Sequence, residues 1–182
     1  MARIPYFDPA NATGRAAEAY KKLPALNIFR MLGHSGDMLD AFIKFGNQIL
    51  YRTEVDPILR EIAIVRVGVL KKGKYEVFQH ERISRQLGMT EDKIKAIHTG
   101  PDAPAFNELE RLVMRFTDDI VANTRASDAT FNAISEKLPV KQVQELVLTI
   151  GYYTAVCYFL ETYDVDIEEK GREATVNMDR KS

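Results

Sequence analysis

Glu76 and His80 stand four residues apart in the segment KKGKYEVFQHERI (71–83), and Glu61 lies in the apolar segment before it. On a helix, residues four apart share a face, so this carboxylate and this imidazole can meet. Histidine has an unperturbed pKa of about 6.5, and a neighbouring carboxylate can hold its tautomer and favour the charged ring. Glu61, Glu76 and His80 are therefore candidates for acid–base catalysis.

The helical stripe that contains this pair is polar at one end only. Glu76, His80, Ile83 and Leu87 fall at positions i, i+4, i+7 and i+11. The apolar end of this stripe should face the core, and Glu76 and His80 lie on the same face of the helix. The ordinary alternative is an exposed ion pair, which stabilises a helix by only about 0.2–0.5 kcal/mol.

Glu61 lies within ILREIAIVRVGVL (58–70), where an unpaired buried carboxylate would be costly. His80 on the next helix is a suitable partner. Arg66 is a competing partner, although five residues along a helix is poor geometry for a shared face. A third possibility is that Glu61 lies on the one wet face of its own helix.

Motifs for metals, phosphates and activated serines are not matched. Di-iron bundles use Glu-x-x-His twice, whereas Glu76 and His80 are one residue too far apart and occur once. His80 and Glu81 begin a zincin-like pattern, but Ser84 stands where the second histidine belongs. Neither a phosphate-binding glycine loop nor a G-x-S-x-G elbow is present. We expect no metal and no cofactor.

Composition narrows the function further. The chain has 182 residues, a hydrophobic share of 46% and a net charge of -1, which is typical of a globular protein without affinity for nucleic acid. Cys157 is the single cysteine, so no intrachain disulfide can form, and we expect it to be an inert core residue. The segment Leu146–Leu160 is shorter than the ~20 residues of a membrane span, and no signal peptide is evident. A cytoplasmic protein with no membrane partner is expected.

Helix caps recur along the chain, and no hairpin signal of the Asn-Gly type occurs, which predicts an all-α fold. The segment 58–70 is rich in β-branched residues and could be a buried strand, but Asp56-Pro57 favours a helix start. Further helices are predicted over 15–23, from 35 to about 49, over 74–87 and 90–98, from about 106 to 122, and after Ser127 and Pro139. Pro24 and Asn27 are interpreted as a loop, and Gly88 as a left-handed helix end.

Three parts of the chain are distinguished on this basis. Residues 1–34 are expected to form an N-terminal arm with short helices, and residues 35–164 a helical domain whose core motif is 56–99. Residues 165–182 are charged and are expected to be a mobile tail.

The stretch LREIAIVRVGVLKKGKYEVFQHERISRQLGMTEDKI (Leu59–Ile94) resembles the carboxymuconolactone decarboxylase family, which shows L-R-E-L, an apolar helix, a histidine motif and G-x-S/T-x-x-x-I. The upstream segment NIFRMLGHS (Asn27–Ser35) is similar to that family's N-terminal part, with Gly36 in place of a proline. The resemblance implies an AhpD-like helical bundle that assembles as a homotrimer or homohexamer. It also implies cofactor-free decarboxylation of a small carboxylated lactone, of the kind met in the catabolism of aromatic compounds.

The related AhpD branch carries the pattern Glu-x11-Cys-x2-Cys-x3-His. Aligned with this chain, its glutamate falls on Glu61, its histidine on His80, and its two cysteines on Gly73 and Glu76. Without sulfur at those positions, a dithiol peroxide cycle within one subunit is not available. The acid–base half of the pattern remains.

Three functions stay open at this point. The first is a cofactor-free lyase or isomerase acting on a small acid or lactone, in which His80 donates the proton, Glu76 orients it, and Glu61 anchors the network or relays protons. The second is an AhpD-like oxidoreductase, which the absent cysteines disfavour. The third is a non-catalytic helical oligomer that binds a small ligand.

Overall fold

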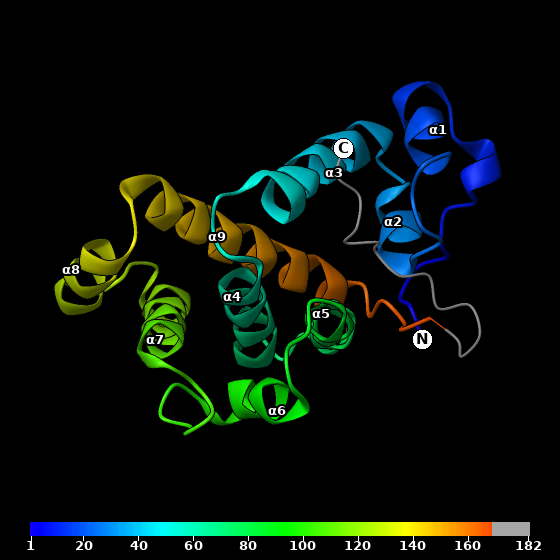
Figure 1. Ribbon diagram of the computed structural model, residues 1–182. Helices are drawn as coiled ribbons and strands as arrows, with labels where there is room; N and C mark the ends of the chain where they lie inside the picture. Colours follow the sequence, from blue (N-terminus) through cyan, green and yellow to red (C-terminus); the bar gives the residue numbers. More distant parts are fainter. Residues whose placement is uncertain (169–182) are drawn as a thin grey trace. The chain divides into compact units, whose positions relative to one another are not determined.

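The computed structural model describes residues 1–168, and these form nine α-helices and one short 3-10 helix, with no β-strand among them (Figure 1). The all-α prediction is confirmed. The chain forms two compact units, Met1–Arg52 with the chain from Phe159 onward, and Thr53–Tyr158. These bounds differ from the predicted domains, because residues 35–52 belong to the first unit and the last long helix contributes to both units.

The first unit contains η1 (Pro9–Asn11), α1 (Gly14–Tyr20), α2 (Asn27–Leu32) and α3 (Gly36–Arg52). The predicted loop at Asn27 is wrong, since α2 begins there without a capping side chain that the sequence could reveal. The predicted tail begins inside this unit, where Glu168 accepts a hydrogen bond from the Asn27 backbone at 2.7 Å. Residues 169–182 of that tail lie outside the described residues.

The second unit holds the sequence motif. Its helices are α4 (Pro57–Leu70), α5 (Lys74–Gln86), α6 (Glu91–Thr99), α7 (Glu108–Asn123), α8 (Asp128–Lys137) and most of α9 (Val140–Thr162). Within it, α4 packs against α5, α6 and α7, so that α4 is the central helix of the unit (Figure 1).

The segment with an ambiguous pattern is the helix α4. Every residue from Leu59 to Gly68 is buried, which explains both its β-branched content and its weak amphipathicity. Asp56 caps the helix by accepting from the Ile58 and Leu59 backbones, with Pro57 at its first position, as the Asp-Pro signal predicted. The segment is therefore a helix buried on all sides, and its polar residues face other helices.

Short connections hold α4 and α5 close together. A Cβ on Gly68 would lie 2.8 Å from Val77 Cγ2, so only glycine permits this approach of the two helices. At the other end of α5, Gly88 has φ +85°, the left-handed conformation that the sequence predicted. The polar faces of α4 and α5 are thereby fixed opposite one another.

The helix α9 is longer than the uncharged segment from which it was predicted. It has 23 residues and a mean hydropathy of 1.3, which is enough to cross a membrane by length and composition alone. Core helices of soluble proteins meet the same test, and 44% of its most apolar window is buried inside the structure. Glu145 of α9 accepts hydrogen bonds from the Glu54 and Val55 backbones at 2.8 and 3.2 Å, which ties α9 to the start of α4.

A candidate active site around His80

The structure brings Glu61, Glu76 and His80 together inside the second unit. Glu61 Oε2 lies 2.6 Å from His80 Nδ1, across the α4–α5 contact. Glu76 Oε1 lies 3.0 Å from His80 Nε2, one turn away on α5. Both ring nitrogens are therefore engaged by carboxylates, and neither the exposed-pair alternative for Glu76 nor the wet-face alternative for Glu61 describes the protein.

The three side chains are almost completely withdrawn from solvent. The exposed fraction is 7% for the His80 side chain and 0% for that of Glu61, and it is 5% for Glu76. Burial by itself lowers the pKa of His80, but the charges of Glu61 and Glu76 and their hydrogen bonds outweigh it and raise that pKa from 6.5 to about 9. His80 is therefore an imidazolium at neutral pH, donating one N–H to each carboxylate.

Arg60 is a member of this cluster that the sequence did not indicate. Its Nε donates to Glu61 Oε1 at 3.2 Å, and its side chain is 4% exposed. Glu61 thus holds His80 with one oxygen and Arg60 with the other. Arg60 and Glu61 are consecutive on a helix, where side chains point about 100° apart. The contact is possible because the arginine side chain is long and can curve back.

Two tyrosines of α9 adjoin the charged groups. The Tyr153 ring stands edge-on to the His80 ring, with centroids 4.8 Å apart. The Tyr152 ring packs against Tyr153 with centroids 5.2 Å apart. Burial first, and the negative charge of Glu76 next, raise the pKa of both phenols above the ordinary value, so both stay protonated at any physiological pH. These aromatic rings help to exclude water from His80.

The competing partner for Glu61 has another role. Arg66 Nε and Nη2 donate to the two carboxylate oxygens of Asp118 at 2.6 and 2.9 Å, and Nη1 donates to the Ile97 carbonyl at 3.0 Å. These contacts join α4 to α7 and α6. Arg66 is thereby committed to the packing of the unit, and Glu61 is left to His80 and Arg60.

Gly73, the position of the first AhpD cysteine, lies beside the single thiol of this chain. A Cβ on Gly73 would lie only 2.8 Å from Cys157 Sγ and 3.6 Å from the Glu76 Cβ. Gly73 has φ −77°, which any residue can adopt, so space and not backbone geometry excludes a side chain there. Cys157 is distant in sequence but adjacent in space to the α5 turn that carries Glu76.

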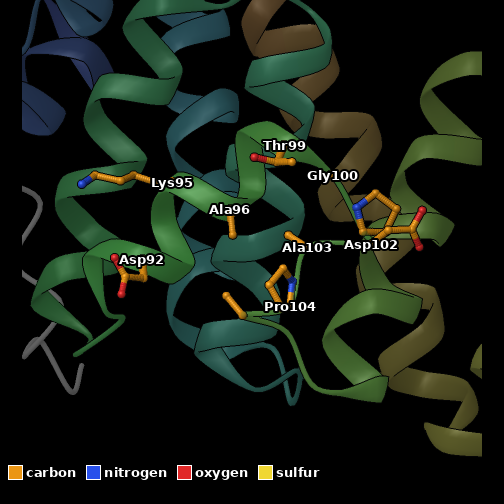
Figure 2. A pocket seen from close by; sticks show the side chains of 10 residues that line it. Asp92, Lys95, Ala96, Thr99, Gly100, Asp102, Ala103 and Pro104 are labelled. Carbon is orange, nitrogen blue, oxygen red and sulfur yellow. The ribbon is translucent and has the colours of Figure 1, made fainter.

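A hollow of about 840 Å³ lies elsewhere on the second unit, over α6 and the 100–105 loop (Figure 2). Its polar lining residues are Asp92, Lys95, Thr99 and Asp102, and the rest of its lining is alanine, glycine and proline. None of the three candidate catalytic side chains lines this hollow. The hollow and the buried cluster are therefore separate features of the second unit.

Comparison with solved structures finds proteins of similar fold. An uncharacterized peroxidase-related protein with an alkylhydroperoxidase AhpD core, from Ralstonia eutropha JMP134, matches with a TM-score of 0.80 at 17% identity, covering 96% of this chain and 98% of that one. An uncharacterized peroxidase-related protein from Silicibacter sp. TM1040 matches with a TM-score of 0.79 at 15% identity, over 94% and 96% of the two chains. A variant of the debrominase Bmp8, solved with 2,3,4-tribromopyrrole, matches with a TM-score of 0.77 at 15% identity, over 92% and 94%. At these identities the likeness establishes the fold alone.

Comparison with curated protein sequences finds no match. The family comparison finds one: residues 36–119 match the model of the carboxymuconolactone decarboxylase family. That segment runs from α3 to α7 and includes Arg60, Glu61, Glu76 and His80. Over residues 36–119 the chain is similar to the carboxymuconolactone decarboxylase family, and its fold is that of AhpD-like proteins.

Proposed function

We propose that this protein is a cofactor-free carbon–carbon lyase that decarboxylates a small carboxylated lactone or a related acid, with His80 as the proton donor. The observation that carries the proposal is the placement of His80 between two buried carboxylates, 2.6 Å from Glu61 and 3.0 Å from Glu76. A buried imidazolium with a pKa of about 9 holds its proton at neutral pH while remaining shielded from water.

The proposed step is balanced within the substrate and the cluster. The bond between carbon and the departing carboxylate breaks, CO2 leaves, and the electron pair moves into a conjugated carbonyl that the substrate itself carries. That pair then returns to form a C–H bond with the proton of His80, whose ring becomes neutral and regains a proton once the product has left and solvent can reach it. The same cluster can serve an isomerisation next to a carbonyl, because that reaction also needs one positioned proton.

The two carboxylates take different parts in this scheme. Glu61 makes the shorter contact with His80 and is completely buried, so it positions the ring and holds its charge. Glu76 makes the longer contact, at Nε2, so in this scheme the reacting carbon reaches that N–H by displacing Glu76. This assignment moves the orienting role from Glu76, where the sequence had placed it, to Glu61.

A thiol-dependent oxidoreductase is the second candidate, and one observation favours it. The sulfur of Cys157 lies against Gly73, the position at which AhpD-type chains carry a cysteine, and two of the fold relatives are described as peroxidase-related. A single thiol needs an external thiol reductant to complete a redox cycle, whereas the decarboxylation needs none.

We also propose that the protein is a homotrimer or homohexamer of the cytoplasm without nucleic-acid or membrane partners. One face of α9 supports self-association, because Val147, Leu148 and Tyr158 are 40%, 54% and 58% exposed there. Gly151 and Ala155 lie exposed between them and would let a second helix approach closely.

The function is tested by measuring CO2 release from a panel of small lactones, β-keto acids and vinylogous acids at neutral pH. The wild-type chain is expected to release CO2 from at least one of them, and the His80→Ala variant to be slower by about 10²–10⁴-fold. His98→Ala is the matched control, since that histidine is 46% exposed and pairs with Glu81 at the surface. CO2 release that survives His80→Ala unchanged would contradict the proposal.

A further inference from the structure

Arg60 carries a donor atom that no described residue satisfies. Its Nε is used by Glu61, but its Nη2 is buried and has no hydrogen-bond partner within residues 1–168. A buried donor on a charged group is costly when left without a partner, and native proteins keep few such atoms. Nη2 is therefore a buried donor that the described protein groups do not use.

The position of this donor relates it to the candidate active site. Arg60 and His80 bind opposite oxygens of the same Glu61 carboxylate, so the guanidinium and the imidazole are separated by a single carboxylate group. Two positive groups, Arg60 and protonated His80, balance two negative ones, Glu61 and Glu76. The cluster consequently has no net charge that would repel an anion.

We propose that Arg60 is the anion-binding residue of this site and that its Nη2 donates to a carboxylate oxygen of the ligand. A guanidinium–carboxylate hydrogen bond is charge-assisted, and the planar guanidinium matches the geometry of a carboxylate better than a lysine ammonium does. Arg60 thereby selects acids over neutral compounds of the same shape.

The inference rests on the proposed function in one respect, namely which carboxylate of the substrate Arg60 binds. A group that loses its charge in the transition state gains nothing from a cation that holds it in the ground state. Arg60 is therefore assigned a carboxylate that the reaction leaves in place, and the departing carboxylate lies away from it.

Binding to the full-length chain tests the role of Arg60 without any turnover. The probes are acetate and benzoate, each compared with its neutral amide, and calorimetry at neutral pH and low salt gives the Kd. The wild-type chain should bind the acids and discriminate against the amides. Arg60→Gln should weaken binding of the acids about 10- to 100-fold and leave the amides unaffected. Arg115→Gln is the matched control, because Arg115 is 54% exposed and pairs with Asp102.

Arg60→Lys covers the case in which Arg60→Gln does not fold, as judged by circular dichroism. Lysine keeps the positive charge but lacks the Nη2 donor, so binding of the acids should also weaken, and selectivity over the amides should fall. Equal binding of acid and amide by the wild-type chain, no binding of either, or wild-type affinity in the Arg60 variants would overturn the inference and leave water as the partner of Nη2.

The outcomes separate this inference from the proposed function. Arg60-dependent binding of acids without any CO2 release would refute the decarboxylase and leave the anion site standing. CO2 release that depends on His80, together with unchanged acid binding in the Arg60 variants, would refute only the anion site.

Discussion

Glu61 Oε2 lies 2.6 Å from His80 Nδ1, and both side chains are closed off from solvent at the contact between α4 and α5. This pairing joins the central helix of the unit to the helix that carries His80. A buried ion pair of this kind is maintained only while both partners are present, because either one alone would be an uncompensated buried charge. The contact is therefore expected to control the ionisation of His80, its orientation and part of the stability of the fold.

Glu61→Gln should lower the pKa of His80 from about 9 toward its ordinary value, because the largest favourable charge interaction is removed. Glu76→Gln should lower it as well, but by less. NMR titration of the imidazole in each variant measures the change. An unaltered titration in Glu61→Gln would mean that the two side chains are not paired in solution.

Stability should fall with rising pH on the alkaline side of neutrality. The folded-state pKa of His80 is raised above 6.5 to about 9, so its contribution is fully present below pH 6.5 and is lost as the pH rises through 9. At about 1.4 kcal/mol per pKa unit, the loss is on the order of 3 kcal/mol. Urea unfolding between pH 6 and 10 measures it, and a His80→Gln variant should lack this segment of the pH dependence.

Gly73→Ala should destabilise the fold by about 1–3 kcal/mol, because its Cβ would lie 2.8 Å from Cys157 Sγ. Cys157→Ala should relieve that clash, so the double variant should be more stable than the sum of the single effects predicts. Thermal unfolding of all four chains completes the cycle. Additive effects would show that the two residues do not touch.

Cys157→Ser should leave the rate of CO2 release nearly unchanged, once any loss of folded protein is corrected for. Cys157 is 1% exposed, and its thiol takes part in no step of the proposed acid–base chemistry. A folded but inactive Cys157→Ser chain, together with an active His80→Ala chain, would instead support the thiol-dependent oxidoreductase.

Leu148→Glu should reduce self-association, because Leu148 is 54% exposed near the middle of the apolar face of α9. Light scattering at micromolar concentration should give a multiple of the 20.7 kDa chain mass for the wild type and a smaller species for the variant. A monomeric wild-type chain would contradict the proposed homotrimer or homohexamer.

The sequence was informative where local chemistry determines the structure. Asp56 and Pro57 marked the start of α4, and the spacing of Glu76 and His80 placed both on one stripe of α5. The helix α2 was missed because Leu26 occupies its N-cap and makes no side-chain hydrogen bond, so no start signal existed. The start of α7 was predicted two residues early, since Asn107, not an earlier residue, forms its capping box.

Features that depend on long-range packing were outside the reach of the sequence. Arg60 is next to Glu61 on a helix, where side chains normally diverge, and only the folded side chain shows that they meet. The approach of Cys157 to Gly73 depends on how α9 packs against α5, which no local pattern encodes. The different distances of Glu61 and Glu76 from His80, 2.6 and 3.0 Å, likewise could not be read from their spacing in the sequence.

The most direct measurement of the central claim is an NMR titration of the His80 ring in the wild-type chain, with the His80→Gln variant used to assign its signals. The imidazole is expected to stay protonated through neutral pH and to titrate with a pKa of about 9. A ring that titrates near 6.5, or is neutral at pH 7, would contradict the assignment of His80 as a buried acid held by Glu61 and Glu76.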